Sequence, residues 1–191
     1  AGLLTHDPGM YPRRLLLAEA RRLGVQLLGI DVNYSTSQYV VQKSGKELGV
    51  RVSLGEISGI SRPEMDRIIC EQPYTDVTDF YLRARPSRRT LERLALVGAL
   101  DTIAGVSNEE SIHNRSDLLV KVRQISSKAA PKIDKNQLAF DLTNLDQLPV
   151  GNTAPTRQQK LEAEMAVTGM DISEHQIQKF QQMLEEMGVV R

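Results

Sequence analysis

The sequence predicts a mainly α fold with a small β element, which makes the chain an α+β protein. Apolar residues recur at helical spacing over most of its 191 residues, and β-rich runs are confined to residues 25–54. Gly59 and Gly98 each end an apolar stretch, as glycines at helix C-termini commonly do. These observations predict two helix-turn-helix corners after a short β region, with a further pair of helices beyond residue 156.

Composition restricts the possible partners of the chain. The 24 basic and 24 acidic residues cancel, so net charge alone predicts no polyanionic partner. An aromatic content of 4% without Trp argues against a protein that stacks single-stranded bases. The single Cys70 excludes an internal disulfide and a cysteine-rich zinc site, and we interpret it as a small core residue. No apolar run approaches the roughly 18 residues of a membrane span, so no membrane partner is expected.

The first expected elements are one amphipathic helix and two or three short strands. Residues 12–23 fit a helix that ends at Gly24. Its predicted inward side chains are Leu15, Leu16, Ala18 and Leu23. Strands are expected within residues 25–33, 39–41 and 50–54, and the last two predict a β-hairpin with a loop of five to eight residues.

Residues 54–61 contain the first corner. A short apolar helix is expected to end at Gly59, and the next helix begins with Ser61 as its N-cap. Pro63 lies in the first turn, and Glu64 follows the cap by three residues, which predicts a capping box. Such a turn offers free amides and close backbone approach, so it can hold a phosphate of duplex DNA without reading its sequence. The alternative is an ordinary corner in a helical core.

The second corner follows two further predicted helices. Asp76 or Thr78 can cap the first of them, which carries Phe80 and Leu82 inward and ends before Pro86. The second covers residues 87–97, and its apolar side consists of Leu91, Leu94, Ala95 and Val97. It leads to the turn at residues 98–101, which lacks a Ser or Thr after its glycine. This second helix-hairpin-helix therefore has a purely structural role as its alternative.

Charged residues are unevenly distributed along the chain. Residues 83–93, directly after the first corner, contain five arginines and one glutamate. Residues 161–187 contain six acidic residues and one lysine. The two regions are therefore expected to face different partners, and solvated helix surfaces are the alternative explanation of both.

The C-terminal third combines helices with a stretch that has no periodicity. A helix is expected over residues 116–125, and residues 126–156 have the composition of a linker. The next predicted helix covers residues 156–168 and stops at Gly169, and a last helix covers residues 174–187. The inward residues of the former are Leu161, Met165 and Ala166.

Taken in order, these features resemble the bacterial C-family DNA polymerases, the family of the DNA polymerase III alpha subunit. Residues 29–33 are similar to a family segment in which two prolines precede Asp-Val-Asn, and residues 57–61 resemble its first hairpin. Residues 88–101 closely resemble the second hairpin, and residues 163–175 resemble the bridge toward its OB-fold. The opening and the tail are most similar to the actinobacterial branch, while replicative and error-prone members share the motifs.

The resemblance implies five segments between the fingers and the OB-fold of such a polymerase. Residues 1–30 would be the end of the fingers, residues 31–55 a small β element, and residues 56–125 the tandem helix-hairpin-helix DNA-binding domain. Residues 126–156 would be a linker with a clamp-binding peptide, and residues 157–191 a helical pair leading to the OB-fold.

The same resemblance implies a DNA-directed DNA polymerase, a nucleotidyltransferase, whose chemistry takes place outside this segment. The aspartates that hold magnesium lie upstream in the palm domain of the family, so no catalytic residue, metal site or cofactor is expected here. His6, His113 and His175 are isolated in the sequence and provide no metal-ligand spacing. The protein would act during replication in the bacterial cytoplasm.

Two groups of residues are predicted to bind partners. The contacts expected with duplex DNA are Gly59, Ile60, Ser61, Arg62, Arg85, Arg88, Arg89, Arg93, Gly98 and Ala99. The sliding clamp would bind an apolar island that resembles the clamp peptide of the family, formed by Gln137, Leu138, Phe140 and Leu142. Packing of this island as a short strand is its alternative. Other replisome subunits are further expected partners.

Two other functions fit the same pattern. One is a non-enzymatic helix-hairpin-helix module of DNA repair, and the other is a helical adaptor that never touches DNA. A palm domain upstream of Ala1 would exclude the first, and salt-dependent duplex binding would exclude the second.

Overall fold

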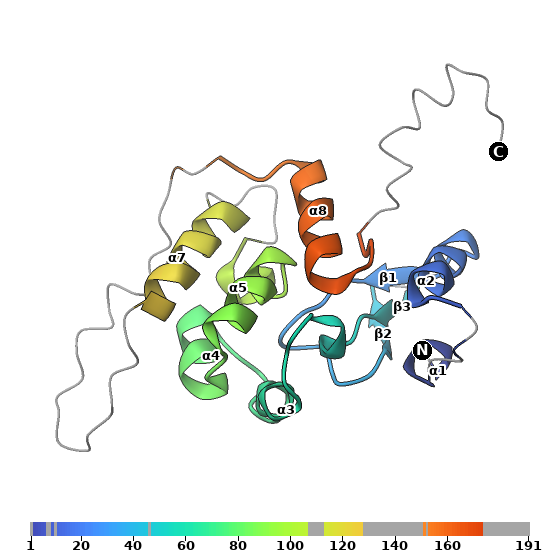
Figure 1. The fold of residues 1–191 in the computed structure, drawn as a ribbon, viewed down its shortest axis with the longest axis horizontal. Coiled ribbons are helices and arrows are strands. Elements are labelled where there is room, and N and C mark those ends of the chain that lie inside the picture. The colour runs from blue at the N-terminus through green and yellow to red at the C-terminus, as the bar shows by residue number, and fades with distance from the viewer. Residues whose placement is uncertain are drawn as a thin grey trace.

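A computed structural model describes residues 2–6, 9, 11–45, 47–106, 113–127, 151 and 153–173. Its elements are α1 (Gly2–His6), α2 (Arg13–Arg22), β1 (Gln26–Leu28), β2 (Val40–Ser44), β3 (Glu47–Arg51), the 3₁₀ turn η1 (Leu54–Glu56), α3 (Arg62–Cys70), α4 (Val77–Ala84), α5 (Arg88–Leu96), α6 (Asp101–Ala104), α7 (Arg115–Ser127) and α8 (Arg157–Thr168). The sheet lies with α1 and α2 at one end of the molecule, and α4, α5 and α7 gather at the other (Figure 1). The predicted mainly α fold with a small β element is confirmed.

The sheet has three strands in the order β1-β3-β2. β1 runs parallel to β3, and β2 is antiparallel to it with Val40 opposite Arg51. β2 ends at Ser44 and β3 begins at Glu47, so two residues connect them and the predicted loop of five to eight residues was wrong. The ladder continues through the polar residues because β2 is an edge strand, where polar side chains can face water.

Helix α2 packs on the core through Leu17, which was not predicted to point inward, and through Leu16, which was. Leu17 is fully buried, whereas Leu15 and Leu23 are exposed. Leucines occupy several faces of this helix, so periodicity alone could not select the one that is fully buried. The helix bounds agree with the prediction to within one residue.

Helices α4 and α5 follow the predicted pattern closely. Asp76 caps α4 by accepting hydrogen bonds from the amides of Thr78 and Asp79 at 2.8 Å. Phe80 is buried as predicted, but Leu82 is exposed, because two residues along a helix correspond to about 200° of rotation. All four predicted inward residues of the α5 region are buried: Leu91, Leu94, Ala95 and Val97.

Helix α8 begins with a complete capping box between Thr156 and Gln159 and ends at Gly169. Leu161 is buried as predicted, whereas Ala166 is exposed and Val167 lies in the core instead. The predicted helix at residues 174–187 lies outside the described residues.

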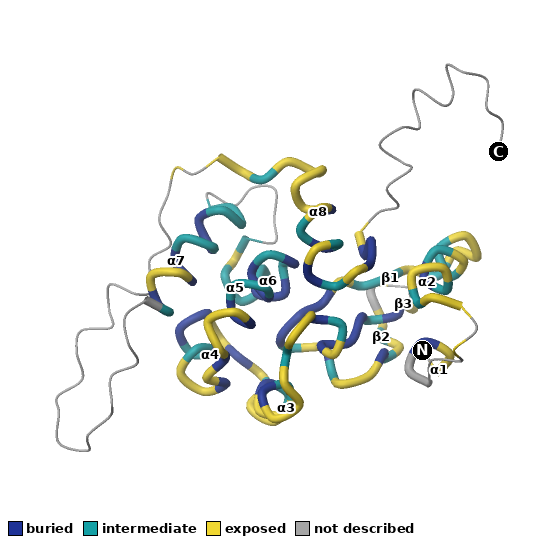
Figure 2. The backbone as a smooth tube through the Cα atoms, viewed as in Figure 1, coloured by how far each residue is buried: buried dark blue, intermediate teal, exposed yellow. Residues whose placement is uncertain are grey.

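One hydrophobic core runs from Leu4 near the N-terminus to Ile172 and includes residues from the sheet and from α3 to α8. Buried backbone accordingly continues from the sheet into the helical end of the molecule (Figure 2). The proposed segment boundaries at residues 30, 55, 125 and 156 stay predictions. Residues of the segments 1–30, 31–55, 56–125 and 157–191 all contribute to this one core.

Candidate nucleic-acid interface

The first hairpin consists of η1, a reversal at residues 57–61 and helix α3. Its expected apolar helix is a single 3₁₀ turn, which Ser53 caps by accepting a hydrogen bond from the amide of Gly55. Leu54 and Ile57 are buried and anchor the turn in the core. The chain then reverses at Gly59, which is exposed and has a φ of 73°, a conformation that favours glycine. The reversal is therefore anchored in the core by Leu54 and Ile57, and Gly59 is exposed to solvent.

Several amides of the first hairpin have no partner in the part of the chain that the structure describes. The amide of Ile60 bonds to the carbonyl of Ile57 at 3.2 Å, but no acceptor is present for those of Gly59, Ser61 and Arg62. Ser61, Arg62 and Gly59 are all exposed. The start of α3 therefore offers free N–H groups and the positive end of a nine-residue helix, which together favour an anion.

The predicted capping of α3 was wrong in one respect. Ser61 occupies the N-cap position with extended backbone, but its side chain accepts no hydrogen bond. Glu64 does not complete a capping box, because its carboxylate lies in the core and faces α5. Cys70 at the end of α3 is exposed, so its prediction as a core residue was also wrong.

Two arginines of α5 lie against the first turn. A β-carbon placed on Gly59 would lie 3.0 Å from Nη1 of Arg93 and 3.8 Å from Cζ of Arg89. These arginines are four residues apart and so share one face of α5. Nη1 of Arg93 is buried without a hydrogen-bond partner among the described residues, and Arg89 is exposed and forms no ion pair there. Neither positive charge is therefore cancelled by an acidic side chain within the described part of the chain.

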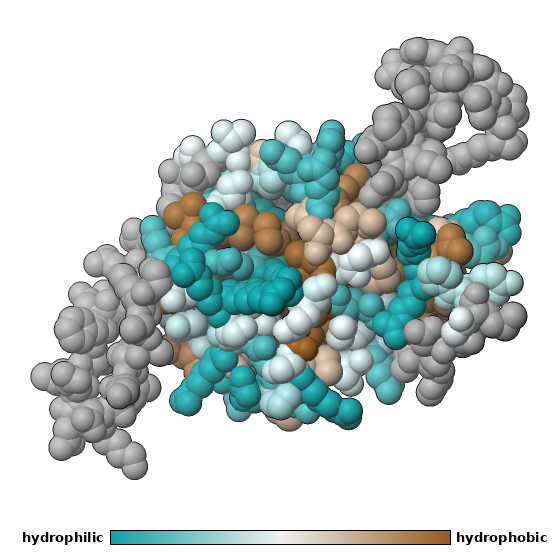
Figure 3. All heavy atoms as spheres, in the orientation of Figure 1, coloured by the Kyte–Doolittle hydropathy of each residue, from teal (hydrophilic) through white to brown (hydrophobic). Residues whose placement is uncertain are grey.

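The three other arginines predicted to contact DNA are Arg62, Arg85 and Arg88. Arg88 forms an ion pair with Glu92 at 3.0 Å on the exposed side of α5. Arg85 ends α4 in the left-handed conformation, and its Nε donates to the carbonyl of Leu82. Arg62 is exposed and follows the turn directly. Figure 3 shows hydrophilic side chains spread over the α5 region of this face.

The second hairpin connects α5 to the short helix α6. Gly98 has a φ of 79°, and its amide bonds to the carbonyl of Ala95 at 3.2 Å. The amide of Ala99 bonds to the carbonyl of Leu94 at 2.9 Å, which completes a Schellman motif at the end of α5. Ala99 is fully buried. The amides of Gly98 and Ala99 are therefore already satisfied within the protein.

An ion pair covers the second turn from outside. Nη2 of Arg115, the first residue of α7, lies 2.5 Å from Oδ2 of Asp101, and Nη1 donates to the carbonyl of Leu96. A β-carbon on Gly98 would lie 2.1 Å from Nη2 of Arg115. Burial raises the pKa of Asp101, and the Arg115 guanidinium opposes this effect. The geometry thus favours the structural alternative for Gly98 and Ala99, whose predicted contacts with DNA stay untested.

Sequence reasoning missed two parts of this region. One is the cover formed by Asp101 and Arg115, and the other is the buried carboxylate of Glu64. Their partners are 14 to 26 residues away in the chain, so no local pattern pointed to them. Glu64 gave a signal only as an acidic residue in a first turn, which is common at helix starts.

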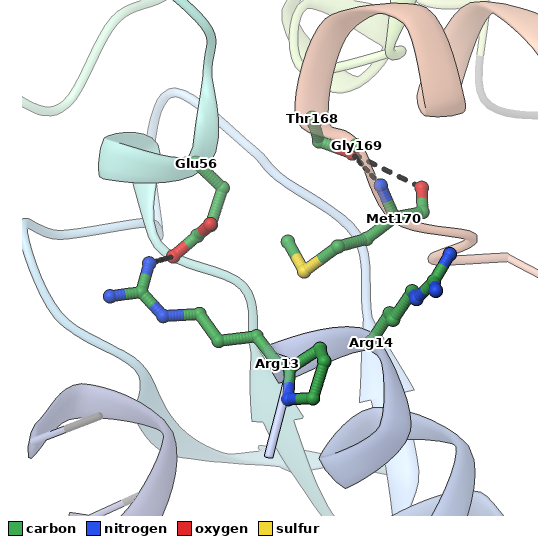
Figure 4. Close-up of a pocket in the computed structure, with 7 residues that line it drawn as sticks. Arg13, Arg14, Glu56, Thr168, Gly169 and Met170 are labelled. Carbon is green, nitrogen blue, oxygen red and sulfur yellow. Dashed lines mark hydrogen bonds and ion pairs between the residues drawn. The ribbon is translucent and has the colours of Figure 1, made fainter. Parts of the chain in front are cut away.

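An open surface pocket of about 400 Å³ lies between α2, η1 and the end of α8. Its lining residues are Pro12, Arg13, Arg14, Glu56, Thr168, Gly169 and Met170 (Figure 4). Arg13 pairs with Glu56 at 2.7 Å across it, and Thr168 bonds to the backbone of Met170. Its polar groups thus mainly satisfy one another, and the predicted DNA contacts lie elsewhere.

The described part of the chain contains no group of three or more His, Cys, Asp or Glu residues that could hold a metal ion. Nor is any described helix long and apolar enough to cross a membrane. The predicted clamp-binding residues, Gln137, Leu138, Phe140 and Leu142, lie outside the described residues.

Comparison with known proteins supports the hairpin assignment. Residues 24–110 match the family model of the helix-hairpin-helix motif. The matched range contains both turn glycines and every residue predicted to contact DNA.

The chain is also similar to bacterial proteins named error-prone DNA polymerase. It is 28% identical over 195 residues to that of Nocardia farcinica, which covers 100% of this chain and 16% of the relative. It is 32% identical over 194 residues to that of Dechloromonas aromatica, with 99% and 17% covered. The chain of Azoarcus sp. is 30% identical over 184 residues, with 91% and 16% covered. The predicted similarity to DNA polymerases is confirmed, and the chain spans about a sixth of the length of these relatives.

Proposed function

We propose that this chain is the part of an error-prone, C-family DNA polymerase that holds duplex DNA for nucleotidyl transfer performed elsewhere in the enzyme. The observation that carries the proposal is the open turn at Gly59, with free amides on one side and two available arginines on the other. Similarity to error-prone polymerases over 99 to 100% of the chain favours a polymerase segment over an isolated repair module.

The first hairpin would bind one phosphate of the duplex backbone. Amides of residues 59–62 would donate to the phosphate oxygens, and the start of α3 adds partial positive charge. Arg89 and Arg93 would neutralise the phosphate from α5, with Arg62 beside the turn. None of these groups reads a base edge, so binding would be non-specific and sensitive to salt.

The remaining predicted contacts would have lesser roles. Arg85 and Arg88 would add long-range attraction, because each already has an intramolecular partner. Gly98 and Ala99 would support the first hairpin by ending α5 firmly, since their amides are satisfied. The tandem hairpin would then contact DNA mainly through its first member.

The test is duplex binding by a double variant, Arg89→Ala/Arg93→Ala, measured by fluorescence anisotropy across a salt titration. Non-specific dissociation constants of about 0.1 mM to 1 µM are expected for the parent chain near physiological salt. Loss of two phosphate contacts should reduce the slope of log K against log salt by about 1.8. Bulky replacements of Gly59 and Ser61 should weaken binding as well.

The matched control is Arg14→Ala/Arg123→Ala, which removes two exposed arginines from α2 and α7 and changes net charge equally. It should leave the salt slope nearly unchanged. Equal slopes for the two double variants would contradict the assignment of this hairpin to DNA.

We further propose that residues 137–142 bind a sliding clamp. The island resembles a Gln-x-x-Leu-x-Phe peptide but departs from it at both apolar anchors, with Phe140 at the fourth place and Leu142 at the last. A labelled peptide of residues 134–145 should bind the clamp in a fluorescence titration and lose binding when both are replaced by Ala. Absence of binding by the parent peptide would contradict this role.

The remaining proposals concern the larger protein. We propose that residues 1–30 end the fingers, that residues 157–191 lead to an OB-fold, and that the polymerase works with other replisome subunits in the bacterial cytoplasm. Magnesium would be held by the palm domain of that polymerase. We propose an actinobacterial origin for the chain from the similarity of its opening and its tail to that branch of the family.

A further inference from the structure

We infer that Glu64 is a positioning residue that sets the two arginines of α5 against the turn at Gly59. The inference rests on the proposed function and adds a residue to it. Glu64 follows the turn by five residues and occupies the first turn of α3, yet its side chain is only 5% exposed. Its carboxylate must therefore find its partners inside the protein.

Those partners are at the start of α5. The backbone amide of Ser87 donates to Oε1 of Glu64, and the hydroxyl of Thr90 donates to Oε2 at 3.0 Å. Ser87 is itself the N-cap of α5 and accepts a hydrogen bond from the amide of Thr90. Among the described residues no cation pairs with Glu64, so its charge is stabilised by these donors and the positive end of α5. Glu64 thus fixes the first turn of α5 to the first turn of α3.

This connection sets the geometry of the proposed site. Gly59 lies three residues before the start of α3, and Arg89 and Arg93 lie within the first two turns of α5. The Glu64 hydrogen bonds therefore join α3 to α5 close to the turn. There, a β-carbon placed on Gly59 would lie 3.0 Å from Nη1 of Arg93. Without them, α5 could shift along α3, and the arginines would lose their common approach to a phosphate held at the turn.

The alternative is that Glu64 only stabilises the fold. The chain provides a control for this, because Glu164 on α8 is equally buried, at 4% exposed. Its carboxylate accepts hydrogen bonds from the amides of Ile172 and Ser173 and from the hydroxyl of Ser173. A Glu164→Ala variant loses the same kinds of bond, none of which involves α5.

The experiment compares Glu64→Ala, Glu64→Gln and Glu164→Ala by duplex binding across a salt titration, at a temperature where circular dichroism shows each variant folded. For Glu64→Ala we expect weaker binding and a salt slope reduced by up to about 1.8, the amount expected for two lost phosphate contacts. Glu64→Gln keeps an acceptor for Ser87 and should restore most of the slope. Glu164→Ala should bind as the parent does.

A second comparison separates this inference from the proposed function. In the Arg89→Ala/Arg93→Ala background, adding Glu64→Ala should cause no further loss of affinity, because the residues that it positions are gone. If the arginine pair weakens binding but Glu64→Ala behaves like Glu164→Ala, the inference fails and the proposed function stands. If the arginine pair has no effect, the proposed function itself fails. Should Glu64→Ala not fold, Thr90→Val removes the hydroxyl that donates to Oε2 of Glu64 and should reduce the salt slope. A parent-like slope for that variant would overturn the inference.

Discussion

The two hairpins give their turn glycines nearly the same backbone conformation, with φ of 73° at Gly59 and 79° at Gly98, but surround them differently. Gly59 is exposed, its amide is free within the described chain, and two arginines approach it without an ion-pair partner. Gly98 has a satisfied amide and lies beneath the pair of Asp101 and Arg115.

The difference shows that one turn geometry can serve either a ligand or the fold. A positive φ and a helix end are required for both uses, so neither feature identifies a binding site. What distinguishes them is whether nearby charges cancel within the protein. Arg115 is neutralised by Asp101, whereas Arg89 and Arg93 approach the open turn from the same face of α5 and form no ion pair among the described residues.

The largest expected effect comes from replacing the turn glycines by alanine. Gly98→Ala should lower the free energy of unfolding by about 3 kcal/mol, because the methyl group would displace the Arg115 guanidinium in addition to the strain of positive φ. Gly59→Ala should cost only about 1 kcal/mol, since its neighbour is the end of a flexible arginine. Urea denaturation measures both. Equal losses would show that the turns are packed alike.

A smaller effect is expected for Arg115→Ala, and it should depend on pH. Burial raises the folded-state pKa of Asp101, so this group favours folding below its ordinary pKa of 3.8 and loses that contribution as pH rises through the folded value. Removing Arg115 raises the pKa further. The variant should therefore be about 2 kcal/mol less stable than the parent at pH 7 and closer to it at pH 4, by urea denaturation. A difference in the free energy of unfolding between parent and variant that grows toward pH 4 would contradict the pairing of Arg115 with Asp101.

The smallest effects are expected at the two helix N-caps. Ser87→Ala should lower stability by about 1 kcal/mol, because the Ser87 hydroxyl accepts the amide of Thr90. Ser61→Ala should change stability by less than about 0.5 kcal/mol, because the Ser61 side chain makes no cap bond. Thermal melting of both variants tests this comparison. A larger loss for Ser61→Ala would mean that Ser61 caps α3 after all.

The sequence by itself determined where several of the helices begin and end. Asp76, Ser87 and Gly169 act as the caps and stops that their residue types predict, and the apolar positions of α5 are buried as their spacing requires. These features were predictable because each depends on contacts within one turn of the same helix. The similarity to DNA polymerases was likewise predictable from ordered local motifs.

Only the tertiary structure decided which of the predicted DNA contacts remain available. It brought Arg115 over Gly98 from 17 residues away, turned Glu64 from a local cap into a bond between two helices, and set Arg89 and Arg93 against Gly59. Local sequence could not determine this, because a charge is available only if no opposite charge from a distant segment meets it. That depends on how helices pack, which is set by the whole core rather than by any one turn.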